Sequence, residues 1–169
     1  MLDIKKILGI LEDHSVRYIV IGGLAAIAQG SVNLTFDLDI CYARDKDNLE
    51  NLAKALSNFH PTLRGAPKDL PFTFDAKTLE NGLNFTLSTD VGDIDLLGEV
   101  QGLGYYDNLL KYSEILEPYG IKCYVLTLEG LIKAKKSLAR PKDLRVLTEL
   151  EALLQIRNQE EKGNVKLAL

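Results

Sequence analysis

The stretch that decides the fold is RYIVIGGLAAIA, residues 17–28. It begins with a β-branched and aromatic run, residues 17–21, which is short enough to be a buried strand. Gly22 and Gly23 then interrupt the strand before a run of small residues, 24–28, that is typical of a helix. The order therefore predicts a strand, a tight turn and a helix.

The next informative segment is TFDLDICY, residues 35–42, in which polar and apolar side chains alternate with period two. This alternation predicts a half-exposed strand, and alternate residues of a strand project to the same side. Asp37 and Asp39 therefore share one face, where two carboxylates repel each other unless a cation such as Mg²⁺ lies between them. An isolated Asp-x-Asp is more often a solvated pair on an open sheet, so this pair alone is a weak signal.

A second Asp-x-Asp pair, Asp93 and Asp95, lies in the predicted strand 93–97, which forms an antiparallel hairpin with strand 84–88. If strand 93–97 pairs beside the first acidic strand, Asp95 joins the cluster. Three carboxylates can hold two Mg²⁺ ions roughly 3.5–4 Å apart, which activates an attacking hydroxyl and stabilises a leaving pyrophosphate. The reaction indicated is in-line nucleotidyl transfer.

The glycine pair strengthens this hypothesis, because Gly22 and Gly23 lie 15 and 14 positions before Asp37. A turn there presents backbone N–H groups and a helix N-terminus to an anion, and would cradle a triphosphate. The alternative is a plain strand-to-helix turn that needs positive φ, which is the commoner role of such a pair. Neither a Gly-x-x-x-x-Gly-Lys-Ser/Thr loop nor a Gly-x-Gly-x-x-Gly motif occurs, so P-loop and Rossmann nucleotide binding have no support.

Periodicity predicts the remaining elements: helices over 4–11, 45–59 and 103–110, a loop over 62–71, a strand over 123–126, and helices from 127 onward with a break at 140–141. We expect an α/β (α+β) fold in which a small, twisted, mixed sheet has helices packed on one side and C-terminal helices close a cleft over the carboxylates. A single domain spans 1–169 in this prediction, with its core over about 15–126 and its C-terminal helices over 127–160.

Composition excludes several classes of protein. The 169 residues include 24 acidic and 20 basic side chains, so the net charge is −4, which argues against a histone-like binder. Cys41 and Cys123 lie in apolar runs without metal-ligand spacing, as expected in a reducing cytoplasm. No stretch approaches the ~18 consecutive apolar residues of a membrane span. We therefore expect a soluble, unsecreted, cytoplasmic protein without a membrane partner.

The tail carries the basic segment LIKAKKSLARPKDL, residues 131–144. Pro141 disfavours helical geometry at Arg140 and starts a new helix, so the chain bends there. Lys135 and Arg140 then border one concave corner, where their charges could bind the phosphates of a nucleotide. The alternative is a solvated basic face with Asp143 at a helix N-terminus. Both interpretations treat Lys135 and Arg140 as exposed, so neutralising them should barely change stability.

Taken together, these segments resemble a known family. IVIGGLA (19–25) with LTFDLDI (34–40) looks like the glycine pair and Thr-x-Asp-x-Asp signature of minimal nucleotidyltransferases of the polymerase-β superfamily. Residues 131–144 are similar to the Lys-x-x-x-x-Arg-x-Lys-Asp segment of AbiEii-type nucleotidyltransferases, many of which are toxins of toxin–antitoxin systems. The resemblance covers both ends of the chain in the order that the family uses.

The resemblance implies an enzyme that uses two Mg²⁺ ions to move a nucleoside monophosphate from an NTP to a hydroxyl of RNA or tRNA, a protein or a small molecule, with a cognate antitoxin as a possible partner. It implies metal binding by Asp37, Asp39 and Asp95, a catalytic role for these and Lys135, and nucleotide binding by Gly22, Gly23, Thr35, Arg140 and Lys142.

Two departures from the family pattern favour alternative hypotheses. Asn33 stands where many relatives carry arginine, and residues 145–148 lack the second aspartate that many relatives have. Both favour a binding or regulatory module that keeps the fold but has lost the chemistry. A third hypothesis is an enzyme that uses the same site on a small molecule such as an aminoglycoside, or on a protein hydroxyl.

Overall fold

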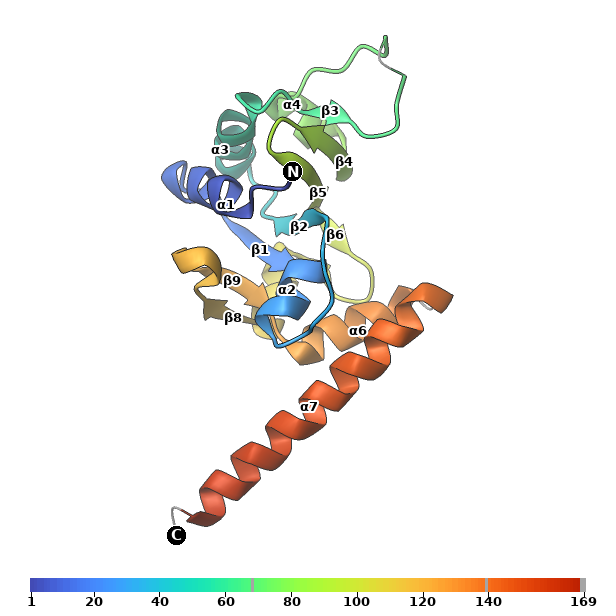
Figure 1. Ribbon diagram of the computed structural model, residues 1–169. Coiled ribbons are helices and arrows are strands. Elements are labelled where there is room, and N and C mark those ends of the chain that lie inside the picture. The colour runs from blue at the N-terminus through green and yellow to red at the C-terminus, as the bar shows by residue number, and fades with distance from the viewer. Residues whose placement is uncertain (68, 139, 168–169) are drawn as a thin grey trace.

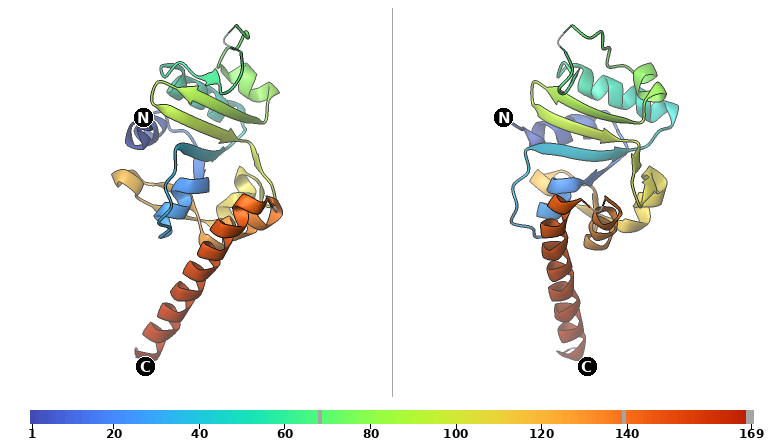
Figure 2. Two further views of the ribbon diagram at one scale, coloured as in Figure 1. Left: turned by 45° about the vertical axis from the view of Figure 1, so that its right-hand side comes forward. Right: turned by 90° about the vertical axis from the view of Figure 1, so that its right-hand side faces the viewer.

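The computed structural model describes residues 1–67, 69–138 and 140–167, without the side chains of residues 142 and 165–167 (Figure 1). Its centre is a twisted, mixed, seven-stranded sheet (Figure 2). In spatial order the strands are β3 (Thr62–Leu63), β4 (Asn84–Thr89), β5 (Gly92–Leu97), β2 (Asp37–Tyr42), β1 (Tyr18–Ile21), β9 (Cys123–Leu126) and β8 (Ser113–Leu116). A separate two-stranded sheet joins β6 (Glu99–Val100) to β7 (Gly104–Tyr105).

The pairing of β4, β5 and β2 confirms the predicted arrangement of the acidic strands. β4 and β5 form the expected antiparallel hairpin. β5 then lies beside β2 as a parallel neighbour, with Asp93 opposite Asp37 and Asp95 opposite Asp39. The second Asp-x-Asp strand therefore pairs next to the first, in register.

The helices surround this sheet. They are α1 (Ile4–Asp13), α2 (Gly22–Ala28), α3 (Lys46–Ser57), α4 (Ala76–Asn81), α5 (Tyr106–Leu109), α6 (Leu128–Leu138) and α7 (Pro141–Leu167), with 3₁₀ turns η1 (Leu110–Tyr112) and η2 (Pro118–Gly120). The predicted helices at both ends of the chain are confirmed, as is the break before Pro141. The prediction of an unbroken loop over 62–71 is wrong at its start, because Thr62 and Leu63 form the edge strand β3 against β4.

The two faces of the sheet differ in chemistry. Leu38 and Ile40 on β2, with Ile94 and Leu96 on β5, are fully buried in the hydrophobic core. Because strand side chains alternate, the aspartates of both strands project to the opposite face. Helix α2 lies on this acidic face, since Gly22 at its start contacts the Asp39 side chain. The helices therefore cover parts of both faces, whereas the sequence predicted helices on one side (Figure 2).

The C-terminal helices pack beside α2. α6 contacts both α2 and α7. α7 runs along the segment that joins α2 to β2, where the Val32 N–H donates to Glu149 at 3.1 Å and Arg157 donates to the Gln29 side chain at 2.9 Å. The end of α7 then projects from the body of the molecule (Figure 1). No helix within the described residues is long and apolar enough to cross a membrane.

A buried asparagine connects β1, which precedes the glycine pair, to β2, which carries the first two aspartates. Asn48 on α3 is 1% exposed, and its side chain accepts from the Arg17 N–H at 2.7 Å. The same side chain donates to the carbonyl oxygens of Arg17 at 3.0 Å and Ala43 at 2.8 Å. Arg17 precedes β1 and Ala43 follows β2, so Asn48 stabilises the register of this antiparallel pair. Asp45 caps the same helix by accepting from the Asn48 N–H.

We expect Asn48→Ala to lower the free energy of unfolding by about 3 kcal/mol, because it leaves the Arg17 N–H and the Ala43 carbonyl oxygen without their side-chain partner. The Arg17 carbonyl oxygen still accepts from the Ala43 N–H. Chemical denaturation measures this loss. Asn51→Ala is the matched control, since Asn51 lies on the same helix and makes no side-chain hydrogen bond with the described residues. Its loss should stay within about 0.5 kcal/mol. Equal losses in the two variants would contradict the role of Asn48.

Candidate active site

Four carboxylates project from the same face of β2 and β5. Asp37 and Asp39 come from β2, and Asp93 and Asp95 come from the positions directly opposite. One oxygen each of Asp37, Asp39 and Asp95 lies within 4.8 Å of the others. The structure therefore brings together the three residues that the sequence predicts as metal ligands, and places Asp93 beside them.

The electrostatics of the cluster favour a bound cation. Burial, with the charges of Asp37 and Asp95, raises the pKa of Asp39 to about 7, against the opposing effects of the Gly23 N–H and Lys135. Burial also raises the pKa of Asp95. Carboxylate oxygens are the ligands that Mg²⁺ prefers, and a divalent cation among them would offset their mutual repulsion.

The glycine pair fits closely against β2 and the residue that precedes it. Gly22 has φ +60°, and a Cβ there would lie 2.1 Å from an Asp39 carboxylate oxygen. A Cβ on Gly23 would lie 2.5 Å from Thr35 Oγ1, which itself donates to the Asp37 carbonyl oxygen at 3.0 Å. Both positions therefore exclude larger side chains for a reason that the sequence did not reveal: Gly22 lies against Asp39, and Gly23 lies against Thr35. Triphosphate binding by this turn remains a prediction.

The basic tail residues meet at one buried carboxylate. Lys135 and Arg140 each donate to Asp143 at 2.9 Å, and the Asp143 side chain is only 5% exposed. Burial alone would raise the pKa of Asp143, but the hydrogen bonds from Lys135 and Arg140 outweigh that effect and lower it. Arg140 is exposed as expected, at 51%, but Lys135 is half-buried, at 26%. The interpretation of the two residues as unpaired surface cations is wrong, because both pair with Asp143. The Lys142 side chain lies outside the described residues.

The sequence analysis assigned no role to Arg64, which the structure places at the centre of the acidic face. Its guanidinium lies 3.0 Å from Asp93 and 3.8 Å from Asp37, and it also pairs with Asp95. Arg64 follows edge strand β3, so only the pairing of β3 with β4 brings it to the carboxylates. A single arginine beside a glycine carries no signal from which this position could be predicted.

Asn33, where many relatives of the resembled family carry arginine, is held against α7. Its amide side chain donates to Glu149 and to Ser31, and its backbone N–H also donates to Ser31. In this chain, position 33 therefore helps to attach the α2–β2 connection to the C-terminal helix.

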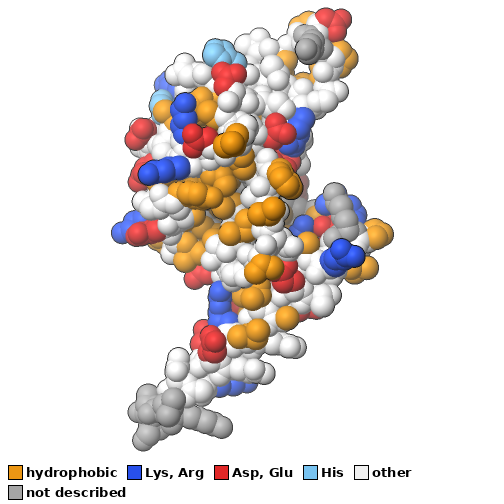
Figure 3. All heavy atoms as spheres, in the orientation of Figure 1, with side chains coloured by type: hydrophobic (Ala, Val, Ile, Leu, Met, Phe, Trp, Pro, Cys, Tyr) orange, Lys and Arg blue, Asp and Glu red, His pale blue; other side chains and the backbone are white. Residues whose placement is uncertain are grey.

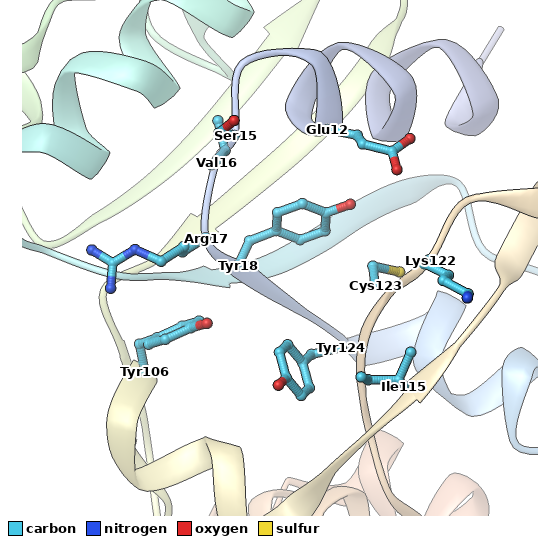
Figure 4. A pocket seen from close by; sticks show the side chains of 10 residues that line it. All are labelled: Glu12, Ser15, Val16, Arg17, Tyr18, Tyr106, Ile115, Lys122, Cys123 and Tyr124. Atoms are coloured by element: carbon cyan, nitrogen blue, oxygen red, sulfur yellow. The ribbon is translucent and has the colours of Figure 1, made fainter.

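A separate cavity of about 330 Å³ lies at the opposite end of β1 from the glycine pair (Figure 4). Tyr18, Tyr106 and Tyr124 line it together with buried Cys123. The Tyr18 hydroxyl is buried without a hydrogen-bond partner among the described residues. None of the predicted site residues that the structure describes lines this cavity, so it is distinct from the acidic site.

Known structures share this arrangement of strands and helices. A Thermotoga maritima protein assigned as a nucleotidyltransferase is 22% identical, with 86% of this chain and 88% of that chain covered and a TM-score of 0.53. The lincosamide antibiotic adenylyltransferase LnuA, solved with lincomycin, is 14% identical over 90% and 98% of the two chains, with a TM-score of 0.57. The antibiotic-resistance factor ANT(2'')-Ia is 13% identical over 98% and 92%, with a TM-score of 0.52.

No protein-family model matches the chain, and neither does any curated protein. The structural similarities show that the chain has the fold of the nucleotidyltransferases. They confirm the fold that the sequence resemblance implied, while the likeness to the AbiEii type stays a prediction.

We expect Asp39→Asn to stabilise the metal-free protein at pH 8. A carboxyl whose pKa rises from 3.8 to about 7 on folding makes the folded state less stable as pH rises through that range. The melting temperature of Asp39→Asn should therefore exceed that of the wild type at pH 8 in a chelating buffer, and the difference should shrink as pH falls toward 4.

Asp69→Asn, at an exposed position, is the control and should show no such pH-dependent difference. A variant at position 39 that melts below the wild type at pH 8 would contradict the electrostatic account.

The contacts of Asp143 lead to a second prediction. Lys135→Ala with Arg140→Ala leaves a buried charge unpaired, and should lower the free energy of unfolding by about 3 kcal/mol. Adding Asp143→Asn should recover most of that loss in a denaturation experiment. Lys136→Ala is the control, because Lys136 pairs with Glu151 at an exposed position and should cost about 0–1 kcal/mol. A triple variant no more stable than the double one would rule out this explanation.

Proposed function

We propose that this chain transfers a nucleoside monophosphate from a nucleoside triphosphate to a hydroxyl group and releases pyrophosphate. The observation that supports this most strongly is the convergence of Asp37, Asp39 and Asp95 on neighbouring strands of a nucleotidyltransferase fold. Fold alone does not fix activity, so the proposal depends on the chemistry of these three side chains.

The residues fit a divalent metal. The cluster consists of oxygen donors only, and one of them, the half-buried Asp39, is costly to ionise without a cation. Asp37, Asp39 and Asp95 would hold Mg²⁺, and three carboxylates suffice for two ions. Bound there, the metal would activate the acceptor hydroxyl and stabilise the charge on the pyrophosphate.

The neighbouring residues position these carboxylates and would bind the nucleotide. Thr35 fixes the start of the acidic strand through its hydrogen bond to Asp37, and the Gly23 N–H donates to Asp39. The turn at Gly22 would let the phosphates approach the backbone closely. Lys135, held in place by Asp143, would supply positive charge for the triphosphate. Arg140 and Lys142 would extend this positive charge.

For the donor and acceptor we propose ATP and a small-molecule hydroxyl. Two of the similar structures support this, since one is an antibiotic adenylyltransferase and the other an antibiotic-resistance factor. RNA is less favoured, because a nucleic-acid acceptor needs a basic surface to meet its phosphates. On the face drawn in Figure 3, basic and acidic side chains are interspersed. Location in the cytoplasm, where ATP and Mg²⁺ are plentiful, fits this role.

A second candidate function is a binding module without catalysis. One observation favours it: Arg64 pairs with carboxylates that the metal would need. If that arrangement were permanent, the fold would bind a partner rather than turn over a nucleotide. A cognate antitoxin would then be one such partner.

The test is label transfer from α-³²P-ATP in the presence of Mg²⁺ to a panel of acceptors: a lincosamide, an aminoglycoside, bulk tRNA and an unrelated protein mixture. We expect label on a small-molecule acceptor with release of pyrophosphate. Asp37→Asn and Asp95→Asn should each reduce the rate at least about 100-fold, because each removes a metal ligand.

The control is Asp69→Asn, which removes an aspartate outside the cluster and should keep the wild-type rate. Label on tRNA or protein would correct the acceptor and keep the chemistry. Nucleotide binding without label transfer to any acceptor would favour the binding module instead.

A further inference from the structure

The guanidinium of Arg64 lies among the carboxylates of the acidic face. It contacts three of the four carboxylates on β2 and β5, namely Asp37, Asp93 and Asp95. Two of these, Asp37 and Asp95, belong to the triad that would hold metal. An arginine and a divalent ion cannot neutralise the same oxygens at once without repelling each other.

The backbone of Arg64 is held in place, whereas its side chain can move. Its backbone N–H donates to the Thr86 carbonyl oxygen at 2.9 Å, which fixes the residue to β4. Gly65 follows at φ +77°, with open space around it. The Arg64 side chain is 27% exposed, so it can change partners by rotation without any change in the sheet.

Asp93 offers Arg64 a contact outside the metal-binding triad. One Asp93 oxygen accepts from the Ser88 hydroxyl at 2.8 Å, and the other lies 3.0 Å from the Arg64 guanidinium. Arg64 can thus leave Asp37 and Asp95 and remain paired with Asp93 at the edge of the site.

We infer that Arg64 makes the site select a metal–nucleotide complex over the free metal ion. Without nucleotide, its guanidinium competes with a divalent cation for Asp37 and Asp95. When a triphosphate arrives with its metal, Arg64 exchanges these carboxylates for the phosphate oxygens, which suit its planar donor groups. The inference rests on the proposed function and adds a specificity-determining residue to it.

The experiment compares wild type, Arg64→Gln and Arg64→Lys for two affinities. Electron paramagnetic resonance of free Mn²⁺ measures metal binding without nucleotide, and calorimetry with a non-hydrolysable ATP analogue and Mg²⁺ measures nucleotide binding. We expect Arg64→Gln to bind free Mn²⁺ about tenfold more tightly, because one competing charge is gone. The same variant should bind the nucleotide about tenfold more weakly, and this loss should shrink at high salt.

Arg64→Lys keeps the charge and should resemble the wild type in Mn²⁺ affinity, while losing part of the nucleotide affinity with its planar donors. Arg17→Gln is the matched control, since Arg17 pairs with Asp45 at the opposite end of β1 from the glycine pair. Both of its affinities should stay at the wild-type values.

The outcomes separate this inference from the proposed function. Suppose that the wild type binds both ligands. If Arg64→Gln then leaves both affinities unchanged or weakens both, the role of Arg64 is overturned and the proposed function is kept. Wild type that binds neither Mn²⁺ nor the nucleotide overturns both. Affinities that move in opposite directions in Arg64→Gln support the inference, because a merely structural role would weaken both.

Discussion

The parallel, in-register pairing of β2 with β5 is the constraint on which the rest of the site depends. It sets Asp93 opposite Asp37 and Asp95 opposite Asp39, so side chains from distant parts of the chain converge on one face. The same register buries Leu38 beside Ile94 on the other face. A slip of one residue would exchange the two faces and place carboxylates in the core. The hydrophobic core therefore enforces the geometry of the acidic cluster.

The carboxylates of the acidic face repel one another, which destabilises the folded protein. The neighbouring elements offset this repulsion in different ways. Asp39 is largely removed from solvent, and burial together with its neighbours raises its pKa to about 7. Arg64 compensates for Asp37, Asp93 and Asp95 from the edge of the sheet. Lys135 approaches from α6, but Asp143 holds it by a separate hydrogen bond. The repulsion that remains among these carboxylates would be offset by a cation bound between them.

Much of the fold follows from local patterns in the chain. The strand, glycine turn and small-residue helix at 17–28, the hairpin of β4 and β5, and the break before Pro141 are all where periodicity and turn residues predict them. Elements with weak patterns were missed. β3 is two residues long and is defined only by its pairing with β4. The helix α4 and the edge strand β8 are likewise too short for a clear period.

The sequence by itself determined which aspartates share a strand face and that two such strands exist, because side-chain direction along a strand is a local property. It also identified the glycine pair and the basic tail as candidates. Only the tertiary structure decided that Gly22 contacts Asp39, that Asp143 joins Lys135 to Arg140, and that Arg64 lies among the carboxylates. The physical reason is that these contacts, apart from the local one between Arg140 and Asp143 at the start of α7, join different secondary-structure elements. Their partners are set by strand pairing and helix packing, which spacing along the chain does not encode.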